Sequence, residues 1–291
     1  MIKLENVVLA SPDQMSFIIQ GLRNPMDSWE KSDSGAGCYI TEDVSVSNKE
    51  KYTVGSVAAR CETCTWCEPL CYGEPEKRSY ILGENDHSLM QRLANAGTDH
   101  RKFMRMMPVY VRITAPLYWW KEFDTYKVGT VANSCSTMHK IQEKEFTWDD
   151  FSYEHLFRVR DCKFGEPVPT LALETTINAL NYWRERYLAA LKTEEETGLP
   201  AKDIWWQMIQ LLPSSYNQTR NVMMNYEVLC NIYHSRKGHR LDEWREFCRW
   251  IKTLPYQELI TGEDITMCDK CKKHYDGCSV DCTHEFEKIE D

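Results

Sequence analysis

Eight of the thirteen cysteines stand in two groups whose spacing suits a metal ion. The first group reads C-x2-C-x2-C-x3-C, and the second, near the end of the sequence, opens with another C-x2-C pair. Two thiolates at this spacing form the tight knuckle that tetrahedral zinc requires, and the first group also matches the run that supplies thiolates to iron–sulfur clusters. The candidate metal ligands are Cys61, Cys64, Cys67, Cys71, Cys268, Cys271, Cys278 and Cys282.

Zinc in a structural role is the interpretation we favour, because a bound ion would hold together a segment with little hydrophobic periodicity. An iron–sulfur cluster and unliganded reactive surface cysteines are the alternatives. The sequence opens without the basic and apolar regions of a secretory signal, so reduced cytosolic thiols are expected rather than a disulfide framework. The other cysteines are isolated and are expected to be packing residues: Cys38, Cys135, Cys162, Cys230 and Cys248.

The composition is that of an ordinary globular protein, and it limits the classes of partner. The 291 residues, 42% of them hydrophobic and 27% charged, suffice for a sizeable core and exclude collagen-like or wholly disordered chains. No apolar stretch approaches the roughly 18 to 20 residues of a membrane helix, so a soluble, cytoplasmic protein without a membrane partner is expected. The formal charge of -9 argues against a nucleic-acid partner and favours small ligands.

Apolar periodicity predicts an α+β fold in which helices dominate around a small sheet. Alternating apolar residues predict strands over 2–9 and 108–115. Ser11 followed by Pro12 is typical of a helix start, which predicts the first helix. Further helices are predicted over 86–106 with a break near Gly97, 117–127, 171–192, 201–212, 221–235 and 241–254.

The domain organisation follows from where this periodicity fails. It is poor from about 27 to 80, where the first cysteine group lies, and this indicates an insertion. Residues 261–291 form a short, charged, cysteine-containing tail. We therefore predict a single domain over 1–260 with a cysteine-bearing insertion, followed by the tail.

Two stretches carry a resemblance to the flavin-dependent thymidylate synthases, and the first is ITAPLYWWKEFDTYKVGTVANSCSTMH, residues 113–139. In that family an Ala-Pro pair leads into R-H-R-x-x-S-x-N-x-x-S-x-R-Y, and Ala115 and Pro116 are similar to that pair. With one inserted residue, the positions that follow are Thr125, Tyr126 and Lys127 on R-H-R, Thr130 on the first Ser, Asn133 on the Asn, Ser136 on the second Ser, and Met138 and His139 on R-Y.

The second stretch is residues 197–236, TGLPAKDIWWQMIQLLPSSYNQTRNVMMNYEVLCNIYHSR. It resembles the family's later helices, where G-x-P precedes L-P and then N-x-R-x-L-x-N-F-x-x-x-R. The positions on that last pattern, without a gap, are Asn225, Glu227, Leu229, Asn231 and Arg236. The resemblance covers about 86–250, interrupted by 140–170, and order and spacing match better than residue identity.

The resemblance implies a helix-dominated α+β fold with a small, mainly antiparallel central sheet, and a homotetramer whose sites lie between subunits. It implies methylation of dUMP to dTMP, with FAD as cofactor and NADPH and methylenetetrahydrofolate as co-substrates. Arg236 would be catalytic, because a fixed cation polarises the pyrimidine carbonyl. The implied substrate-binding residues are Ser136, Asn133, Lys121 and Arg220, and the implied cofactor-binding residues are Lys127, Thr130, Asn225 and Asn231.

Several positions depart from the family pattern where it holds phosphates. Thr125, Tyr126, Met138 and Glu227 stand where the family has basic residues, and neither Thr nor Met can replace a bidentate guanidinium on a phosphate. The positive charge that holds a phosphate would then come from other residues of the two stretches, namely Lys121, Lys127, Arg220 and Arg236. A catalytically inactive nucleotide- or flavin-binding protein of the same fold, and a sibling enzyme acting on a different pyrimidine nucleotide, are the alternative functions.

Overall fold

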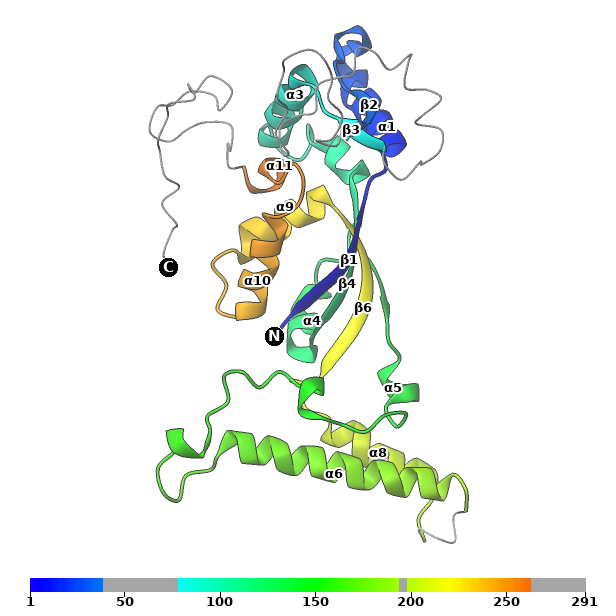
Figure 1. The fold of residues 1–291 in the computed structure, drawn as a ribbon, viewed down its shortest axis with the longest axis vertical. Helices are drawn as coiled ribbons and strands as arrows, with labels where there is room; N and C mark the ends of the chain where they lie inside the picture. The colour runs from blue at the N-terminus through cyan, green and yellow to red at the C-terminus, as the bar shows by residue number, and fades with distance from the viewer. Residues whose placement is uncertain (39–77, 194–197, 263–291) are drawn as a thin grey trace, which may run out of the picture.

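The computed structural model describes residues 1–38, 78–193 and 198–262. All eight candidate metal-ligand cysteines lie outside these residues, as does most of the predicted insertion. The described part is arranged in three tiers: helices above a central sheet, and a pair of helices below it (Figure 1).

The central sheet has four strands in the order β1-β4-β6-β5, and every neighbouring pair is antiparallel. Its strands are β1 (Lys3–Leu9), β4 (Pro108–Pro116), β6 (Asn217–Asn225) and β5 (Val131–Ser134). A second, two-stranded sheet pairs β2 (Gly35–Cys38) with β3 (Arg78–Ile81). The prediction of a helix-dominated α+β fold around a small antiparallel sheet is confirmed.

Helices cover one face of the central sheet, namely α4 (Leu117–Phe123), α9 (Tyr226–Arg236) and α10 (Asp242–Ile251) (Figure 1). Alternate residues of β4 are buried beneath them, as the apolar alternation predicts. The helices contribute tightly packed aromatic rings, and the centroids of Trp119 and Trp244 are 4.7 Å apart. Trp119 and Trp120, whose place the sequence leaves open, are both interior residues.

The upper tier contains the first helix and the flanks of the predicted insertion. Its elements are α1 (Pro12–Arg23), η1 (Asn24–Met26), η2 (Trp29–Lys31), α3 (Glu84–Asn95), η4 (Lys102–Met106) and α11 (Glu258–Thr261). The helix start predicted at Ser11 is confirmed, because the Ser11 hydroxyl accepts from the Gln14 backbone N–H at 3.2 Å and Gln14 accepts in return at 2.8 Å.

A buried carboxylate, Asp86, joins three of these elements. It accepts hydrogen bonds from Arg23 Nε at 2.5 Å, Ser32 Oγ at 2.7 Å and Ser34 Oγ at 2.6 Å. In the opposite direction, the Asp33 carboxylate accepts from the backbone N–H of Asp86 at 3.1 Å and so caps α3. The segment that leads into residues 39–77 is thus fixed to α1 and α3.

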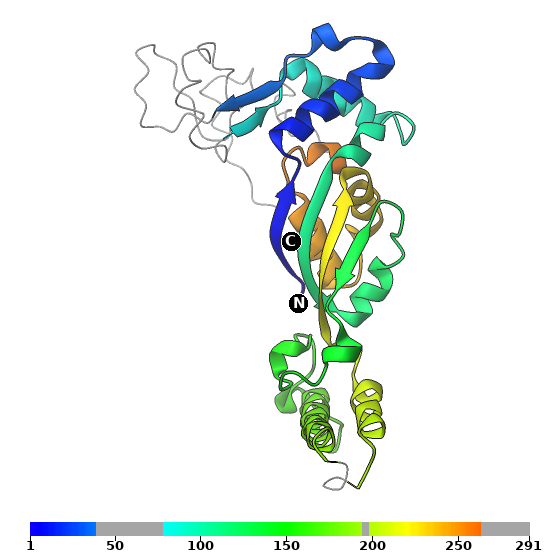
Figure 2. The same ribbon diagram turned by 90° about the vertical axis from the view of Figure 1, so that its right-hand side faces the viewer.

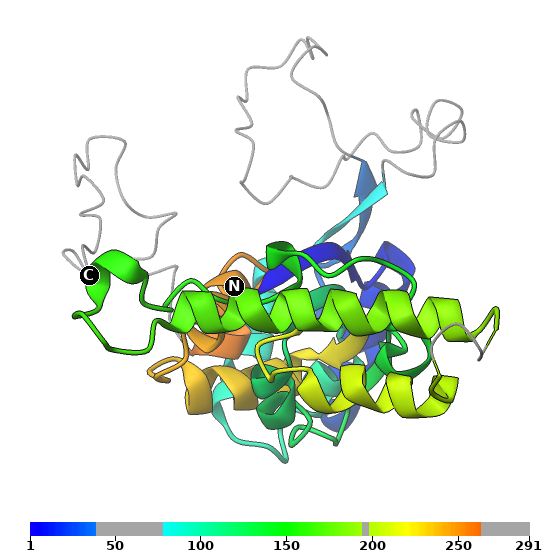
Figure 3. The same cartoon turned by 90° about the horizontal axis from the view of Figure 1, so that it is seen from below.

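The lower tier, which Figures 2 and 3 show at the end of the sheet, packs around a hydrophobic cluster of its own. It is built mainly from α6 (Pro169–Ala190) and α8 (Ala201–Leu211), which run side by side across the end of the sheet. Leu173, Ile177, Leu180 and Met208 are its buried centre. The segments that link it to the sheet contain α5 (Thr137–Lys140), η5 (Trp148–Asp150) and η6 (Val159–Asp161).

The helix predicted over 221–235 is wrong in its first turn and a half. Residues up to Asn225 belong to β6, and the helix begins only at Tyr226. β6 pairs with β4 along its whole length, and this non-local pairing outweighs the local helical spacing of the apolar residues. The strand β5 was not predicted, and α4 ends at Phe123 rather than at 127.

The expectation for the isolated cysteines holds in part. Cys230 and Cys248 are buried packing residues, and Cys162 is half-buried. Cys135 is exposed, so its prediction as a packing residue is wrong. It continues the edge strand β5, whose residues are all exposed, and its backbone N–H donates to Thr219 at 3.0 Å. The side chain of Cys38 lies outside the described residues.

Candidate functional site

Arg236, the predicted catalytic residue, is the last residue of α9 and is held on three sides. Its Nη1 lies 2.9 Å from Glu122 Oε2, and its Nε donates to the Tyr126 hydroxyl at 2.9 Å. The guanidinium lies over the Trp244 ring, 4.9 Å from its centroid. This is a fixed cation of the kind that the implied role requires.

Glu122 is the centre of this group, and the sequence did not single it out. The oxygen that pairs with Arg236 also accepts from Trp244 Nε1 at 2.9 Å and lies 3.4 Å from His239 Nε2. One carboxylate at the end of α4 therefore gathers residues from α9, from α10 and from the loop between them. Only the folded chain brings these residues together, since Glu122 and Trp244 are far apart in the sequence.

Arg220, a predicted substrate-binding residue, is paired in the same way on β6. Its Nη1 lies 2.6 Å from Asp124 Oδ1, its Nε donates to Gln218 at 2.9 Å, and its guanidinium stacks 4.1 Å from the Trp120 ring centroid. Both candidate arginines thus have carboxylate partners two residues apart at the end of α4. Their charge is already balanced within one chain.

Lys121 and Lys127, the other candidate cations, are exposed. Among the described residues neither has a carboxylate within ion-pair distance. They flank Glu122 and Asp124 in the sequence, so the end of α4 and the turn after it carry both the paired and the unpaired charges. An anion that approaches the end of α4 therefore finds unpaired lysine, rather than unpaired arginine, as its partner.

The segment after α4 runs along α9 and brings three predicted cofactor-binding residues close together. Gly129 has a positive φ of 77°, and a Cβ there would lie 3.0 Å from Asn225 Nδ2, so the segment approaches the start of α9 closely. Thr130, the next residue, has a buried hydroxyl with no hydrogen-bond partner among the described residues. With Lys127, these residues form one corner beside the N-terminus of α9.

Asn225 and Asn231 have different places in the structure. Asn225 caps α9, and its side-chain oxygen accepts from the Val228 backbone N–H at 3.0 Å. Asn231 is exposed, and its side-chain oxygen accepts from Arg101 Nη2 at 3.3 Å. The two predicted flavin-side residues are therefore not on a common face.

Glu227 stands where the family has an arginine, and the structure gives it a partner. This buried carboxylate lies 2.7 Å from Arg101 Nε, and Arg101 also donates to Cys230 Sγ at 3.2 Å. A buried carboxylate needs a cationic partner, but the sequence does not indicate that Arg101, in the turn after α3, is that partner.

Asn133 and Ser136 lie on the exposed side of the sheet edge. Asn133 faces Asn221 across the β5–β6 ladder, and Ser136 precedes α5. Both side chains are exposed and are far along the sheet from the start of α9.

The buried thiols near these residues are not poised as nucleophiles. Burial raises the pKa of Cys248 to about 11, although the charge of Arg236 opposes this shift. Burial also raises the pKa of Cys230, against the charge of Arg101. Both thiols are therefore protonated at neutral pH, and a thiol is a poor nucleophile.

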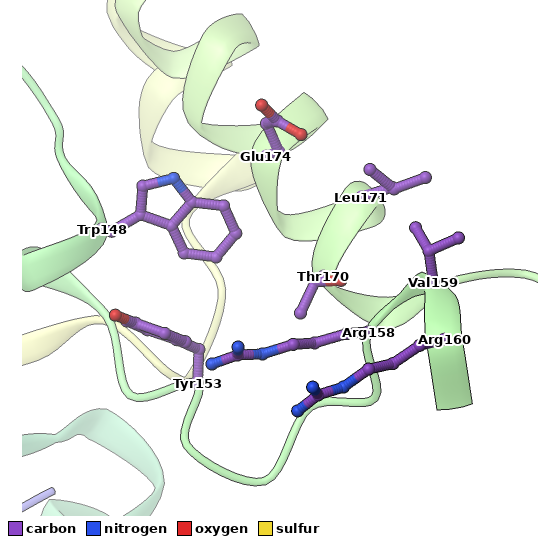
Figure 4. Close-up of a pocket in the computed structure, with 8 residues that line it drawn as sticks. All are labelled: Trp148, Tyr153, Arg158, Val159, Arg160, Thr170, Leu171 and Glu174. Carbon is purple, nitrogen blue, oxygen red and sulfur yellow. The ribbon is translucent and has the colours of Figure 1, made fainter. Parts of the chain in front are cut away.

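A pocket of about 490 Å³ lies in the lower tier, and no predicted site residue lines it (Figure 4). Within the residues that the structure describes, no group of three or more His, Cys, Asp or Glu side chains could hold a metal ion. In that same part of the chain, no helix is long and apolar enough to span a membrane.

Comparison with solved structures finds two crystal structures of the flavin-dependent thymidylate synthase ThyX from Helicobacter pylori with FAD and dUMP. Each is 14% identical to this chain with a TM-score of 0.49 and covers 90% of it, and the matched shares of the Helicobacter chains are 97% and 98%. A UMP/dUMP methylase, PolB from Streptomyces cacaoi with bound 5-Br UMP, is 16% identical with a TM-score of 0.40, over 62% of this chain and 83% of that one. No protein-family description and no curated protein sequence matches this chain.

Proposed function

We propose that this protein is a flavin-dependent methylase of a pyrimidine deoxynucleotide, which converts dUMP to dTMP with methylenetetrahydrofolate and NADPH. The observation that carries the proposal is the pairing of the two stretches that resemble the family. The first stretch opens with the last four residues of β4, and these pair with β6 of the second stretch. Tyr126 from the first stretch meets Arg236 from the second at 2.9 Å. Motif residues more than 100 positions apart thus meet in one place.

FAD is the proposed cofactor, and the corner beside α9 fits an anionic group. The buried hydroxyl of Thr130 lacks a partner within the described residues, and a Cβ at Gly129 would lie 3.0 Å from the side chains of Asn225 and Val228, a tight contact at a positive φ that favours glycine. Lys127 adds an unpaired positive charge, and the amide groups at the start of α9 favour an anion. Lys127, Thr130 and Asn225 would hold the cofactor in this corner. Asn231, which accepts from Arg101 on another face of α9, would contact the cofactor only from outside it.

The bound flavin would supply hydride chemistry, and the chain would bind, orient and polarise the nucleotide. Arg236 would donate from its remaining N–H groups to the pyrimidine carbonyl and stabilise negative charge on the ring. Glu122 and Tyr126 would hold the guanidinium still while it does so. Lys121, Arg220, Asn133 and Ser136 would contact the nucleotide.

The first test is the visible absorption spectrum of the protein purified without oxygen, before and after dithionite. If the spectrum has flavin bands that bleach with dithionite, the next experiment is an assay of dUMP-dependent oxidation of the reduced flavin. We expect Arg236→Ala to abolish that oxidation while the thermal unfolding midpoint stays near that of the unaltered chain. Arg249→Ala, which removes an exposed arginine from α10, is the matched control. Full oxidation activity in Arg236→Ala would contradict the assignment.

An inactive nucleotide-binding protein is a second candidate, and one observation favours it. Arg236, Arg220 and the buried Glu227 all have partners within the chain, so no unpaired arginine stands at the candidate site among the described residues. Such a protein would show a dUMP-dependent rise in melting temperature without turnover. A sibling enzyme would instead oxidise its flavin with UMP or dCMP and not with dUMP.

The cysteine groups remain a proposed zinc site, in which Cys61 to Cys71 and Cys268 to Cys282 supply the ligands. We expect the purified protein to hold at least one equivalent of zinc, and a chelator to lower its melting temperature. Elemental analysis of the intact chain, with iron measured alongside zinc, checks both metals. A content of only a small fraction of an equivalent of zinc or iron after reconstitution would rule the site out.

A further inference from the structure

The pocket in the lower tier is built from three segments that the candidate site does not use. Trp148 and Tyr153 come from η5 and the chain after it, Arg158 and Arg160 from η6 and the residue before it, and Glu174 from the second turn of α6 (Figure 4). Its volume of about 490 Å³ falls in the range of small-molecule sites.

The aromatic wall is held in place by the surrounding chain. Trp148 and Tyr153 meet edge to face, with ring centroids 5.0 Å apart, and both pack against the lower hydrophobic cluster. The Asp150 carboxylate accepts from the Thr147 backbone N–H at 2.9 Å, which fixes the turn that carries Trp148. A planar ligand would therefore meet a preformed apolar surface.

Two guanidinium groups enter the same opening, and neither is hydrogen-bonded to a carboxylate. Figure 4 shows the Arg158 side chain extended across the pocket toward Tyr153, with Arg160 alongside it. No carboxylate of the described residues lies within ion-pair distance of Arg158. The nearest carboxylate oxygen to Arg160, on Asp161, is 3.8 Å from its Nε, which is too far for a hydrogen bond.

These features exclude several ligand classes. A divalent cation would find one carboxylate, Glu174, and two like charges, and nucleic acid would need a broader basic surface than two arginines on a chain of charge -9. A neutral apolar molecule would contact the rings but make no use of the two guanidinium groups, of which Arg158 has no carboxylate partner among the described residues. An aromatic ring that carries an anionic group satisfies both the rings and the guanidinium forks.

We propose that this pocket binds a small planar anion, with its ring against Trp148 and Tyr153 and its carboxylate or phosphate on Arg158 and Arg160. Carboxylate and phosphate share the chemistry that two guanidinium groups recognise. Glu174, at the far side of the opening, would accept from an N–H group of a ligand that carries one. The site is separate from the candidate site around Arg236, so its occupancy does not depend on the proposed methylase activity.

Fluorescence titration with 1-anilinonaphthalene-8-sulfonate, an aromatic anion, tests the proposal on the full chain. We expect the double variant Arg158→Gln, Arg160→Gln to bind this probe at least tenfold more weakly, because both counter-charges are removed. Arg92→Gln, which removes an exposed arginine from α3, is the matched control and should bind as the unaltered chain does. The neutral probe N-phenyl-1-naphthylamine should show no difference between these variants.

Two further measurements locate the bound probe and identify the anionic group that the pocket prefers. Trp148→Phe keeps a ring in the pocket but should weaken the energy transfer from tryptophan to the probe, because Trp183 and Trp205 of the same tier remain as more distant donors. Competition by 1-naphthoate and by 1-naphthyl phosphate then tells whether carboxylate or phosphate is preferred. Equal probe affinity in the double arginine variant and the unaltered chain, with unchanged melting temperatures, would overturn the proposal.

Discussion

At the scale of single residues, the candidate site is organised by carboxylates that no sequence pattern singles out. Arg236 could be predicted because its spacing from Asn225 and Asn231 follows a known pattern. Its partner Glu122 could not, because the contact depends on how α4 is packed against α9 and α10. The same holds for the pairing of Arg220 with Asp124. Sequence spacing thus locates the cations but not the anions that balance them.

Glu122 holds Arg236 in place but also competes with a ligand for its charge. In Glu122→Gln the amide oxygen can still accept from Arg236 and Trp244, while the negative charge is lost. We expect dUMP to bind more tightly, by about fivefold, because a partly exposed ion pair of this kind is worth about 1 kcal/mol. Calorimetric titration with dUMP measures the change.

The control for Glu122 is Glu143→Gln, which removes an exposed carboxylate paired with Lys140 at the end of α5. It changes the net charge equally without touching Arg236, so dUMP affinity should stay as it is in the unaltered chain. Weaker dUMP binding in Glu122→Gln would show that the negative charge is needed to position the guanidinium, and would contradict the competition argued above.

At the scale of elements, the prediction was correct where residues within the segment itself determine its structure. The start of α1 follows from Ser11 and its capping box, and α6 follows from a long helical spacing. β6 was missed because a strand in the middle of a sheet is stabilised by its neighbours, which the local pattern does not contain. Asn225 was predicted inside the helix for the same reason, whereas in the structure it ends β6 and caps α9.

Asp86 makes the junction between α1, α3 and the segment before residue 39 dependent on pH. Burial alone would raise the pKa of this carboxyl, but hydrogen bonds from Ser34, Ser32 and Arg23 together lower it below the ordinary value of 3.8. Because the pKa is lowered on folding, the stabilisation is complete well above 3.8 and is lost as the pH falls through the folded-state pKa.

We therefore expect Asp86→Asn to lower the free energy of unfolding by about 3 kcal/mol at pH 7, since it leaves the buried Arg23 without its counter-charge. The difference from the unaltered chain should shrink as the pH is lowered below about 4. Urea unfolding at a series of pH values measures both effects. A difference that stays constant across the series would show that the charge of Asp86 contributes nothing to this junction.

At the scale of the whole molecule, helices cover one face of the sheet, and among the described residues none covers the other. Val8, Tyr110, Met223 and Val131 stand opposite one another across all four strands. The alternating residues Val109 and Val111 of β4 are buried, so the row lies on the opposite face from the helices, which Figure 2 shows on one side of the sheet. Val8 is 57% exposed, Tyr110 46% and Val131 63%. A continuous apolar row of this kind is typical of an interface, and it supports the proposed homo-oligomer, a tetramer in the implied arrangement.

Val131→Glu tests this interface, because it places a charge at the β5 end of the row, on an exposed side chain, without disturbing the interior of the chain. We expect the unaltered protein to have a mass in solution several times 34.2 kDa, and Val131→Glu to have a lower mass at the same concentration. Light scattering on the eluted peak gives both masses. Val128→Glu is the control, since Val128 is 91% exposed and lies outside the row. If the unaltered protein has the mass of one chain, the row has another role and the candidate site is complete within a single chain.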